Sequence, residues 1–228
     1  MPSTDRLLAE LGELLTENAV GVGRLTPRPR GGRLTGDPRR ALEQTLAFLE
    51  DTPSSLGCLV YGNGCFAVGR YTDAAAVYQG ILTLQPDDLD ARFNLGLTHL
   101  RLKDSQRAVE DLNLVLAQDP SMAEAHYQLG NAYDDMGAGE LALTGYEQAK
   151  ALQPGYLQAI YNKGVVLAKL GRHREAVVEF DQAVALRPGL SNAYMNRGAS
   201  LDELGRHQDA INDRSEERRV GKECRSRW

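Results

Sequence analysis

The sequence predicts an all-α solenoid built from repeated helix pairs, because residue types recur every 34 positions over most of the chain. Three columns keep this interval: Pro86, Pro120, Pro154 and Pro188; Gly62, Gly96, Gly130, Gly164 and Gly198; and Ala74, Ala108, Ala142, Ala176 and Ala210. A single helix pair cannot bury its apolar face alone. We therefore expect stacked pairs, stabilised by their neighbours rather than by one central core.

Each column has a structural role within the predicted pair. Glycine inside a helix costs about 1 kcal/mol relative to alanine, so the glycine column marks a position where a neighbouring helix comes too close for a side chain. The alanine column is expected to supply the matching small surface, and the prolines end the second helix. The residues expected to close the first helix in a left-handed conformation are Gly69, Gly137, Gly171 and Gly205, with Lys103 as the exception.

The N-terminal segment, residues 1–20, is predicted to contain a short amphipathic helix. Its residues 5–18 place five leucines on one side: Leu7, Leu8, Leu11, Leu14 and Leu15. The favoured interpretation is a lid packed on the repeats or a weakly ordered tail. The alternative is a docking helix for a partner or for a second copy of the chain.

Residues 21–37 and 38–54 are predicted to be a linker and a capping helix. The linker is rich in Gly, Pro and Arg and has no apolar periodicity. Its four arginines could contact a nucleic acid backbone, but the segment is short and lacks interleaved aromatics, which favours a solvated linker. After it, Asp37 can cap a helix whose first residue is Pro38, and this helix is expected to shield the first repeat.

The repeat array is predicted to occupy residues 55–213. Four full repeats precede a partial fifth: Ser55 to Asp88, Leu89 to Met122, Ala123 to Tyr156, Leu157 to Leu190, and Ser191 to Asp213. The pattern fails after Ile211, where Arg214 falls in the column that holds Tyr146 and Phe180.

The last 15 residues, RSEERRVGKECRSRW, read as the in-frame translation of a short-read sequencing adapter whose opening codons encode Arg-Ser-Glu-Glu-Arg. We therefore interpret residues 214–228 as a non-native artefact. On this interpretation the natural protein is truncated here and continues beyond Asp213. The open C-terminal end, with apolar residues such as Ile211, is expected to fray or to self-associate.

Charge and hydropathy exclude some classes of protein. The net charge is −5, and it is −8 without residues 214–228, which carry six basic and three acidic residues. A chain this acidic is a poor candidate for general nucleic-acid binding. It has no apolar run of about 18 residues, so no membrane-spanning helix is expected. No secretory signal is recognised either, and the default compartment is the cytoplasm.

The central repeat carries a family pattern. Seven of its residues fall on the motif W-x2-L-G-x2-Y, A-x3-F, P, with the Trp replaced and Tyr in place of Phe: His126, Leu129, Gly130, Tyr133, Ala142, Tyr146 and Pro154. Over roughly residues 55–213 the chain resembles the tetratricopeptide repeat family. The resemblance implies a right-handed superhelix in which first helices line a concave groove that binds extended or helical peptides.

Carried onto this sequence, the groove would be lined by amides and aromatics. The expected peptide-binding residues are Asn63, Phe93, Asn94, Tyr127, Gln128, Asn131, Tyr161, Asn162 and Asn196. An amide offers both a donor and an acceptor, so a ladder of amides can hold a peptide backbone at regular intervals. The ladder resembles that of O-linked N-acetylglucosamine transferases. The alternative is generic repeat chemistry with a binding site elsewhere.

No catalytic constellation, cofactor site or metal-ligand cluster is recognised in the sequence. The function expected is a scaffold or adaptor that binds a partner protein or peptide of unknown identity. Two alternatives are kept: the recruiting region of a larger enzyme such as a glycosyltransferase, and an assembly factor that oligomerises through residues 7–15. For the adaptor, Asn94→Ala with Asn162→Ala is expected to weaken partner capture without changing helicity or melting.

Overall fold

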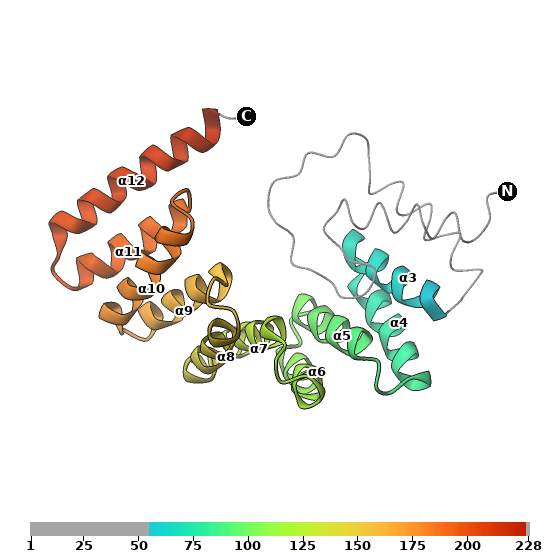
Figure 1. Cartoon of the computed structure of the whole chain (residues 1–228). Coiled ribbons are helices and arrows are strands. Elements are labelled where there is room, and N and C mark those ends of the chain that lie inside the picture. The colour runs from blue at the N-terminus through green and yellow to red at the C-terminus, as the bar shows by residue number, and fades with distance from the viewer. Residues whose placement is uncertain (1–54, 227–228) are drawn as a thin grey trace. The chain divides into compact units, whose positions relative to one another are not determined.

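The computed structural model describes residues 55–226, and every element in that range is an α-helix (Figure 1). The predicted N-terminal helix, linker and capping helix, residues 1–54, lie outside the described residues. The described helices are α3 Ser55–Val68, α4 Tyr71–Leu84, α5 Leu89–Arg101, α6 Ser105–Gln118, α7 Ala123–Asp135, α8 Gly139–Leu152, α9 Leu157–Lys169, α10 His173–Leu186, α11 Ser191–Glu203 and α12 His207–Ser226. They follow one another as helix-turn-helix pairs, which confirms the predicted fold class.

The chain divides into two compact units at Pro120. Unit 1 contains α3 to α6, and unit 2 contains α7 to α12. Within each unit, a first helix packs against its own second helix, and the second helix packs against the first helix of the next pair. None of the described helices is long and apolar enough to span a membrane.

The turn inside each pair uses one residue in the left-handed conformation. Its φ is 86° at Gly69, 74° at Gly137, 75° at Gly171 and 72° at Gly205, and it is 63° at Lys103. These are the predicted positions, including the exception. A residue in the left-handed conformation allows the amide of the following residue to donate a hydrogen bond to a carbonyl of the helix that has just ended. The Ala138 amide, for example, donates to the Tyr133 carbonyl at 2.9 Å.

The second helices end two residues before each proline of the proline column. Gln153, which precedes Pro154, has φ −134° and ψ 91°, outside the helical region. The ring of a proline disfavours the helical conformation for the residue before it, so the prolines fix where α4, α6, α8 and α10 stop. The predicted role of the proline column is confirmed.

The glycine column marks a close approach between the two helices of a pair. A Cβ added at Gly62, Gly130 or Gly164 would lie 2.7, 2.7 or 2.8 Å from the ring of Tyr78, Tyr146 or Phe180. Each of these rings is buried and belongs to the second helix of the same pair. The sequence predicted a close neighbour at the glycine column. In these three pairs that neighbour is mainly the aromatic ring of the second helix rather than the alanine of the alanine column. The five alanines of that column are nonetheless fully buried.

Basic side chains of two first helices each join two second helices. Arg197 on α11 contacts Asp181 of α10 and Asp213 of α12, each at 2.6 Å. Lys163, 34 positions earlier on α9, contacts Glu147 of α8 and, at 2.8 Å, Glu179 of α10. Burial alone would lower the pKa of Lys163, but its hydrogen bonds to the two glutamates outweigh burial and raise that pKa. The same bridge, a basic residue of a first helix paired with acidic residues of the two neighbouring second helices, thus occurs twice in unit 2.

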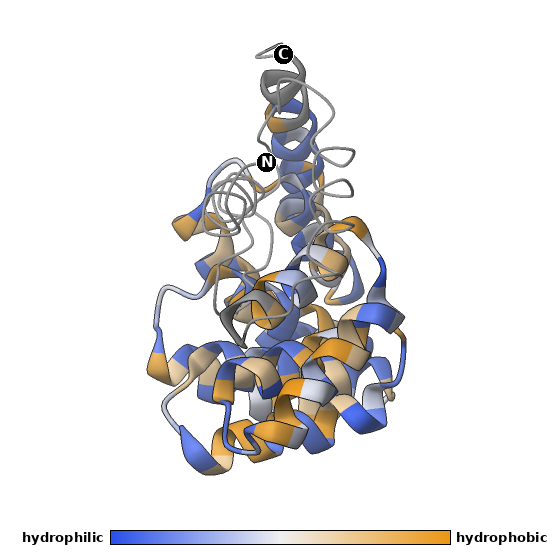
Figure 2. Cartoon of the chain, turned by 90° about the vertical axis from the view of Figure 1, so that its right-hand side faces the viewer, coloured by the Kyte–Doolittle hydropathy of each residue, from blue (hydrophilic) through white to orange (hydrophobic). Residues whose placement is uncertain are grey.

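The last described helix departs from the repeat. Helix α12 has 20 residues, whereas the other helices have 13 or 14, and Figure 2 shows the helix leading to the C-terminus as largely hydrophilic. Arg214, at a position that is buried in α8 and α10, is exposed and pairs with Asp202. Val220 is buried in a cluster with Ile160 and Tyr194. Ile211 is 52% exposed, as expected, while the interpretation of residues 214–228 as non-native stays a prediction.

The close approach predicts opposite effects for two glycine-to-alanine changes. A Cβ at Gly145 would lie 2.8 Å from the amide nitrogen of Gly130 and 2.9 Å from the carbonyl of His126, both backbone atoms of α7. Gly145→Ala is expected to lower the free energy of unfolding by about 1–3 kcal/mol because the helices must separate. Gly80 in α4 has open space around it, so Gly80→Ala is expected to raise this free energy by up to about 1 kcal/mol. Urea denaturation of both variants measures the free energy of unfolding. An increase in this free energy in both variants would contradict the prediction.

The bridge at Lys163 predicts acid sensitivity. Its hydrogen bond to Glu147 lowers the pKa of Glu147 from the usual 4.5. A depressed folded-state pKa contributes stability above the unfolded value, and that stability is lost as the pH falls through the lowered pKa. Glu147→Gln should therefore destabilise the chain at about pH 6 and make progressively less difference below about pH 4.5. Glu203→Gln, an exposed position on α11, is the matched control, and an equal pH dependence in the two variants would refute the prediction.

Candidate functional site

The residues predicted to bind a peptide all lie on first helices. Asn63 belongs to α3, while Phe93 and Asn94 belong to α5. In unit 2, α7, α9 and α11 carry the remaining six: Tyr127, Gln128, Asn131, Tyr161, Asn162 and Asn196. Hydrogen bonds join these side chains from one first helix to the next within each unit.

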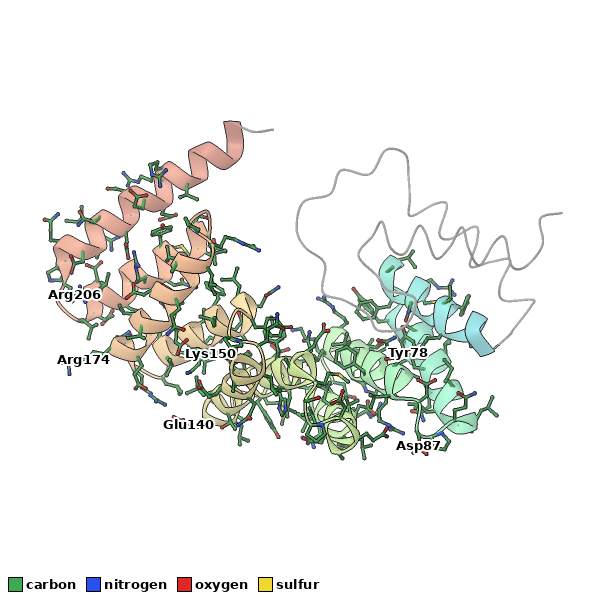
Figure 3. All side chains as sticks on the ribbon, viewed as in Figure 1. Tyr78, Asp87, Glu140, Lys150, Arg174 and Arg206 are labelled. Carbon is green, nitrogen blue, oxygen red and sulfur yellow. The ribbon has the colours of Figure 1, made fainter. Side chains whose placement is uncertain are left out.

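In unit 1, the two asparagines form a buried triad with a tyrosine. The Asn94 amide donates to Asn63 Oδ1 at 2.9 Å, and the Tyr78 hydroxyl donates to the same oxygen at 2.7 Å. All three residues are fully buried, and Tyr78 lies among α3, α4 and α5 (Figure 3). Burial raises the pKa of Tyr78 well above its usual value, so the phenol stays protonated and remains a donor. One oxygen therefore ties three helices together.

The same triad recurs 68 positions later in unit 2. The Asn162 amide donates to Asn131 Oδ1 at 3.0 Å, and the Tyr146 hydroxyl donates to that oxygen at 2.9 Å. Burial raises the pKa of Tyr146 as well. The Asn131 amide in turn donates to Gln128 Oε1 at 2.9 Å. The side chains of α7, α8 and α9 are therefore joined as those of α3, α4 and α5 are.

Tyrosine hydroxyls of the first helices accept a second set of amide bonds. Asn162 donates to Tyr127 at 3.2 Å, and Asn196 donates to Tyr161 at 2.9 Å. The ring of Tyr127 lies 5.1 Å from that of Tyr156 and 5.9 Å from that of Tyr146, measured between centroids. Ring packing thus holds Tyr127 in place, and the amides fix the hydroxyls, so these side chains are positioned before any partner binds.

The predicted residues differ between the units in their exposure. Asn63, Phe93 and Asn94 are fully buried, and Gln128 is almost so. Five remain partly exposed, and Met195 beside them is 47% exposed. We call the following set the first-helix face of unit 2: Tyr127, Gln128, Asn131, Tyr161, Asn162, Met195 and Asn196.

One expectation is corrected by these contacts. Replacing Asn94 and Asn162 by alanine was expected to leave melting unchanged. Asn94 is fully buried and bonded to Asn63, and Asn162 donates two bonds to α7. Removing a partner from a buried hydrogen bond costs about 1–3 kcal/mol, so this double change must lower the melting temperature.

Tyr78 and Tyr146 were not among the predicted site residues, although a signal was present. Where the position after the column glycine is Asn, the second helix carries Tyr 15 positions later, as in the pairs Asn63 with Tyr78 and Asn131 with Tyr146. In the other two full repeats both positions are apolar, as Leu97 with Leu112 and Val165 with Phe180, whereas the partial fifth repeat has Ala199 with Arg214. In the four full repeats, polarity at the two positions therefore changes together.

The chemistry that the face of unit 2 offers is hydrogen bonding and apolar contact. Its polar groups are amides and phenols, and burial raises the pKa of Tyr161 as it does that of Tyr146. These groups are neutral near neutral pH. In the described part of the chain, no group of three or more His, Cys, Asp or Glu residues could hold a metal ion.

Comparison with known families and structures gives a consistent result. A family model described as tetratricopeptide repeat matches residues 65–123, 127–191 and 161–215. These matches cover well over half of the chain. No curated relative matches at the sequence level.

Similar solved structures share the helical architecture. "Crystal structure of MamA" aligns with a TM-score of 0.69 at 24% identity, covering 73% of this chain and 97% of that chain. "Crystal structure of MamA protein" gives a TM-score of 0.67 at 23% identity, with 79% and 93% covered. "MamA AMB-1 C2221" gives 0.61 at 23% identity, with 81% and 99% covered. At these identities the likeness concerns the fold alone.

The paired positions predict a compensating double substitution. Asn131→Val removes the acceptor of Tyr146 and Asn162, and it is expected to lower the free energy of unfolding by about 2–3 kcal/mol. Adding Tyr146→Phe recreates the pair Val165 with Phe180, so much of that loss should be regained. A double-mutant cycle in urea measures the coupling. Strictly additive effects would show that the hydroxyl and the amide do not depend on each other.

Proposed function

We propose that this chain, which belongs to the tetratricopeptide repeat family, is an adaptor that binds an extended segment of a partner protein on the first-helix face of unit 2. Repeats of this family generally serve as scaffolds for protein–protein interaction. The observation that carries the proposal is the row of apolar and amide side chains on α7, α9 and α11, in which Tyr127, Tyr161 and Met195 are at least partly exposed. Three successive first helices present a large apolar side chain followed by an amide at the same repeat positions.

The apolar part of this face suits a peptide side chain at each repeat. Tyr127, Tyr161 and Met195 occupy equivalent positions 34 residues apart. Tyrosine offers a large contact area at a small cost in side-chain entropy, because it has few rotatable bonds. Hydrogen bonds and ring contacts already restrict both tyrosines, which lowers the entropic cost of binding further.

One amide of the face, that of Asn162, favours partner groups that donate hydrogen bonds. Asn162 uses both hydrogens of its amide on Tyr127 and Asn131. What it can offer a partner is its carbonyl oxygen, an acceptor. An extended peptide presents a backbone N–H at every residue other than proline. Backbone donors of the partner are therefore the natural complement of Asn162.

A selected peptide and two matched variants test this proposal. A library of peptides displayed on phage is selected against the full chain, and the binders are then measured with Met195→Glu and Val178→Glu. Met195 lies on the face, whereas Val178, on the second helix α10, is 54% exposed. Each variant adds one charge at an exposed apolar position, so neither should change stability by more than about 0.5 kcal/mol.

The expected result is a loss of affinity with Met195→Glu of at least about tenfold, or 1.4 kcal/mol, with unchanged binding by Val178→Glu. A loss confined to Val178→Glu would place the site on the second helices. Equal binding by both variants would also contradict the proposal. Circular dichroism and urea denaturation confirm that both variants remain folded.

A further inference from the structure

The first helices of unit 2 change in chemistry from α7 to α11. At one repeat position the residue is Asn131 on α7, Val165 on α9 and Ala199 on α11. Asn131 accepts hydrogen bonds from Tyr146 and Asn162, whereas the side chains of Val165 and Ala199 have no polar atoms. Val165 is partly exposed and Ala199 is exposed. The accessible surface is therefore polar beside α7 and apolar between α9 and α11.

Four side chains form this apolar surface, which we call the apolar patch. Tyr161 and Val165 are four residues apart on α9, so they lie on one side of that helix. The same holds for Met195 and Ala199 on α11. The two helices are neighbours at this point, since the Asn196 amide donates to the Tyr161 hydroxyl at 2.9 Å. All four residues of the patch are at least partly exposed.

The patch suits a large apolar side chain of a partner. The ring of Tyr161 lies 6.0 Å from that of Phe180, measured between centroids, and this contact restricts its movement. Met195 is 47% exposed, and its unbranched side chain can adapt to the group that it contacts. Ala199 extends only one carbon from the backbone, so it leaves room beside Met195. An aliphatic or aromatic side chain placed here would remove apolar surface from water, which favours binding.

A negative charge borders the patch on α11. Glu203, the last residue of α11, lies one turn beyond the patch and is exposed, with no ion pair in the described part of the chain. The nearby charges are paired: Lys169 contacts Asp134 at 2.8 Å. Asp202 pairs with Arg214, and it would add a second negative charge if residues 214–228 are non-native. The C-terminal end of a helix is itself partially negative, so this edge favours a cation.

We propose that the segment bound by unit 2 places one large aliphatic or aromatic side chain on the apolar patch and a lysine or arginine beside Glu203. Four residues of α11, from Ala199 to Glu203, span about 6 Å, and an extended chain advances about 3.3 Å per residue. The basic residue therefore lies within about two residues of the apolar one. The inference rests on the proposed adaptor function and names its partner as a basic segment with an apolar anchor.

Other partners fit this surface less well. An acidic or phosphorylated segment would bring its charge against Glu203 and the C-terminal end of α11. A wholly polar segment would gain nothing from covering Met195. A second copy of this chain has a net charge of −5, which disfavours its approach to Glu203.

Peptides selected on phage against the full chain test the proposal. Peptides that lose affinity with Met195→Glu should carry a lysine or arginine within two positions of a large apolar residue. One of them is then synthesised in its selected form and with that basic residue replaced by glutamate. Fluorescence polarisation measures both peptides with the unchanged chain, with Glu203→Lys and with Glu175→Lys. Glu175 is exposed on the second helix α10 and provides the matched control.

The charge variants should give opposite results with the two peptides. Glu203→Lys should weaken the selected peptide about fivefold at low salt, because an attraction between exposed charges becomes a repulsion. The same variant should bind the glutamate-substituted peptide more tightly than the unchanged chain does. Glu175→Lys should change neither affinity. Added salt should weaken the selected peptide on the unchanged chain, because exposed charges are screened, and should not weaken it on Glu203→Lys.

A second pair of variants tests the apolar anchor. Ala199→Leu fills the room beside Met195, whereas Ala185→Leu adds the same group at an exposed position of α10. Ala199→Leu should weaken the selected peptide about tenfold through overpacking, and Ala185→Leu should leave its affinity unchanged. Replacing the apolar residue of the peptide by alanine should remove most of the effect of Ala199→Leu, which a double-mutant cycle measures. Circular dichroism checks that both variants remain folded.

Several outcomes would overturn the inference. Peptides that bind the face without the two features, or with an acidic residue beside the apolar one, would refute it and leave the adaptor function standing. Equal effects of Glu203→Lys and Glu175→Lys, or of Ala199→Leu and Ala185→Leu, would refute it as well. Selected peptides that are all insensitive to Met195→Glu would instead contradict the proposed function, and this inference with it.

Discussion

The array depends on the close approach between a first helix and a large side chain of its own second helix, at Gly62, Gly96, Gly130 and Gly164. At Gly130 the ring of Tyr146 lies where a Cβ would be, and Gly145 lets the backbone of α8 approach that of α7. These contacts fix the distance between the paired helices. Because protein interiors are close-packed, a side chain at the glycine position would collide with the large side chain opposite in these pairs, which explains why glycine recurs there every 34 residues.

A second constraint acts between pairs and is mainly polar. One asparagine oxygen, on Asn63 or Asn131, accepts from the tyrosine of its own pair and from the asparagine of the next first helix. The intervening pairs use Leu97 with Leu112 and Val165 with Phe180 at these positions. A buried amide is costly unless it is bonded, so an isolated change at one position is disfavoured. This explains why the two positions are polar together or apolar together in the four full repeats.

The sequence predicted the pairs, the turns and the helix ends because these depend on residues whose backbone preferences are strong. Glycine tolerates a positive φ and proline ends a helix, so Gly137 and Pro154 have roles that can be inferred without a structure. The amides were harder to interpret, because an asparagine on a first helix can face a partner or a neighbouring repeat. Asn94 is buried and Asn162 is partly exposed, although both occupy the same repeat position. The repeat pattern does not distinguish these two cases.

The internal bonds of the amide ladder also limit how it can recognise a partner. A ladder with free amides could accept and donate along a peptide in either direction. In unit 2, Asn162 has already donated both hydrogens to α7, and Asn196 has donated one to Tyr161. The bonds that hold the repeats together therefore leave only the carbonyl oxygen of Asn162 for a partner, whereas Asn196 keeps one amide hydrogen. Stability and specificity share the same side chains here, and a substitution that tests one necessarily changes the other. For this reason, exposed residues such as Met195 separate the two effects better than the amides do.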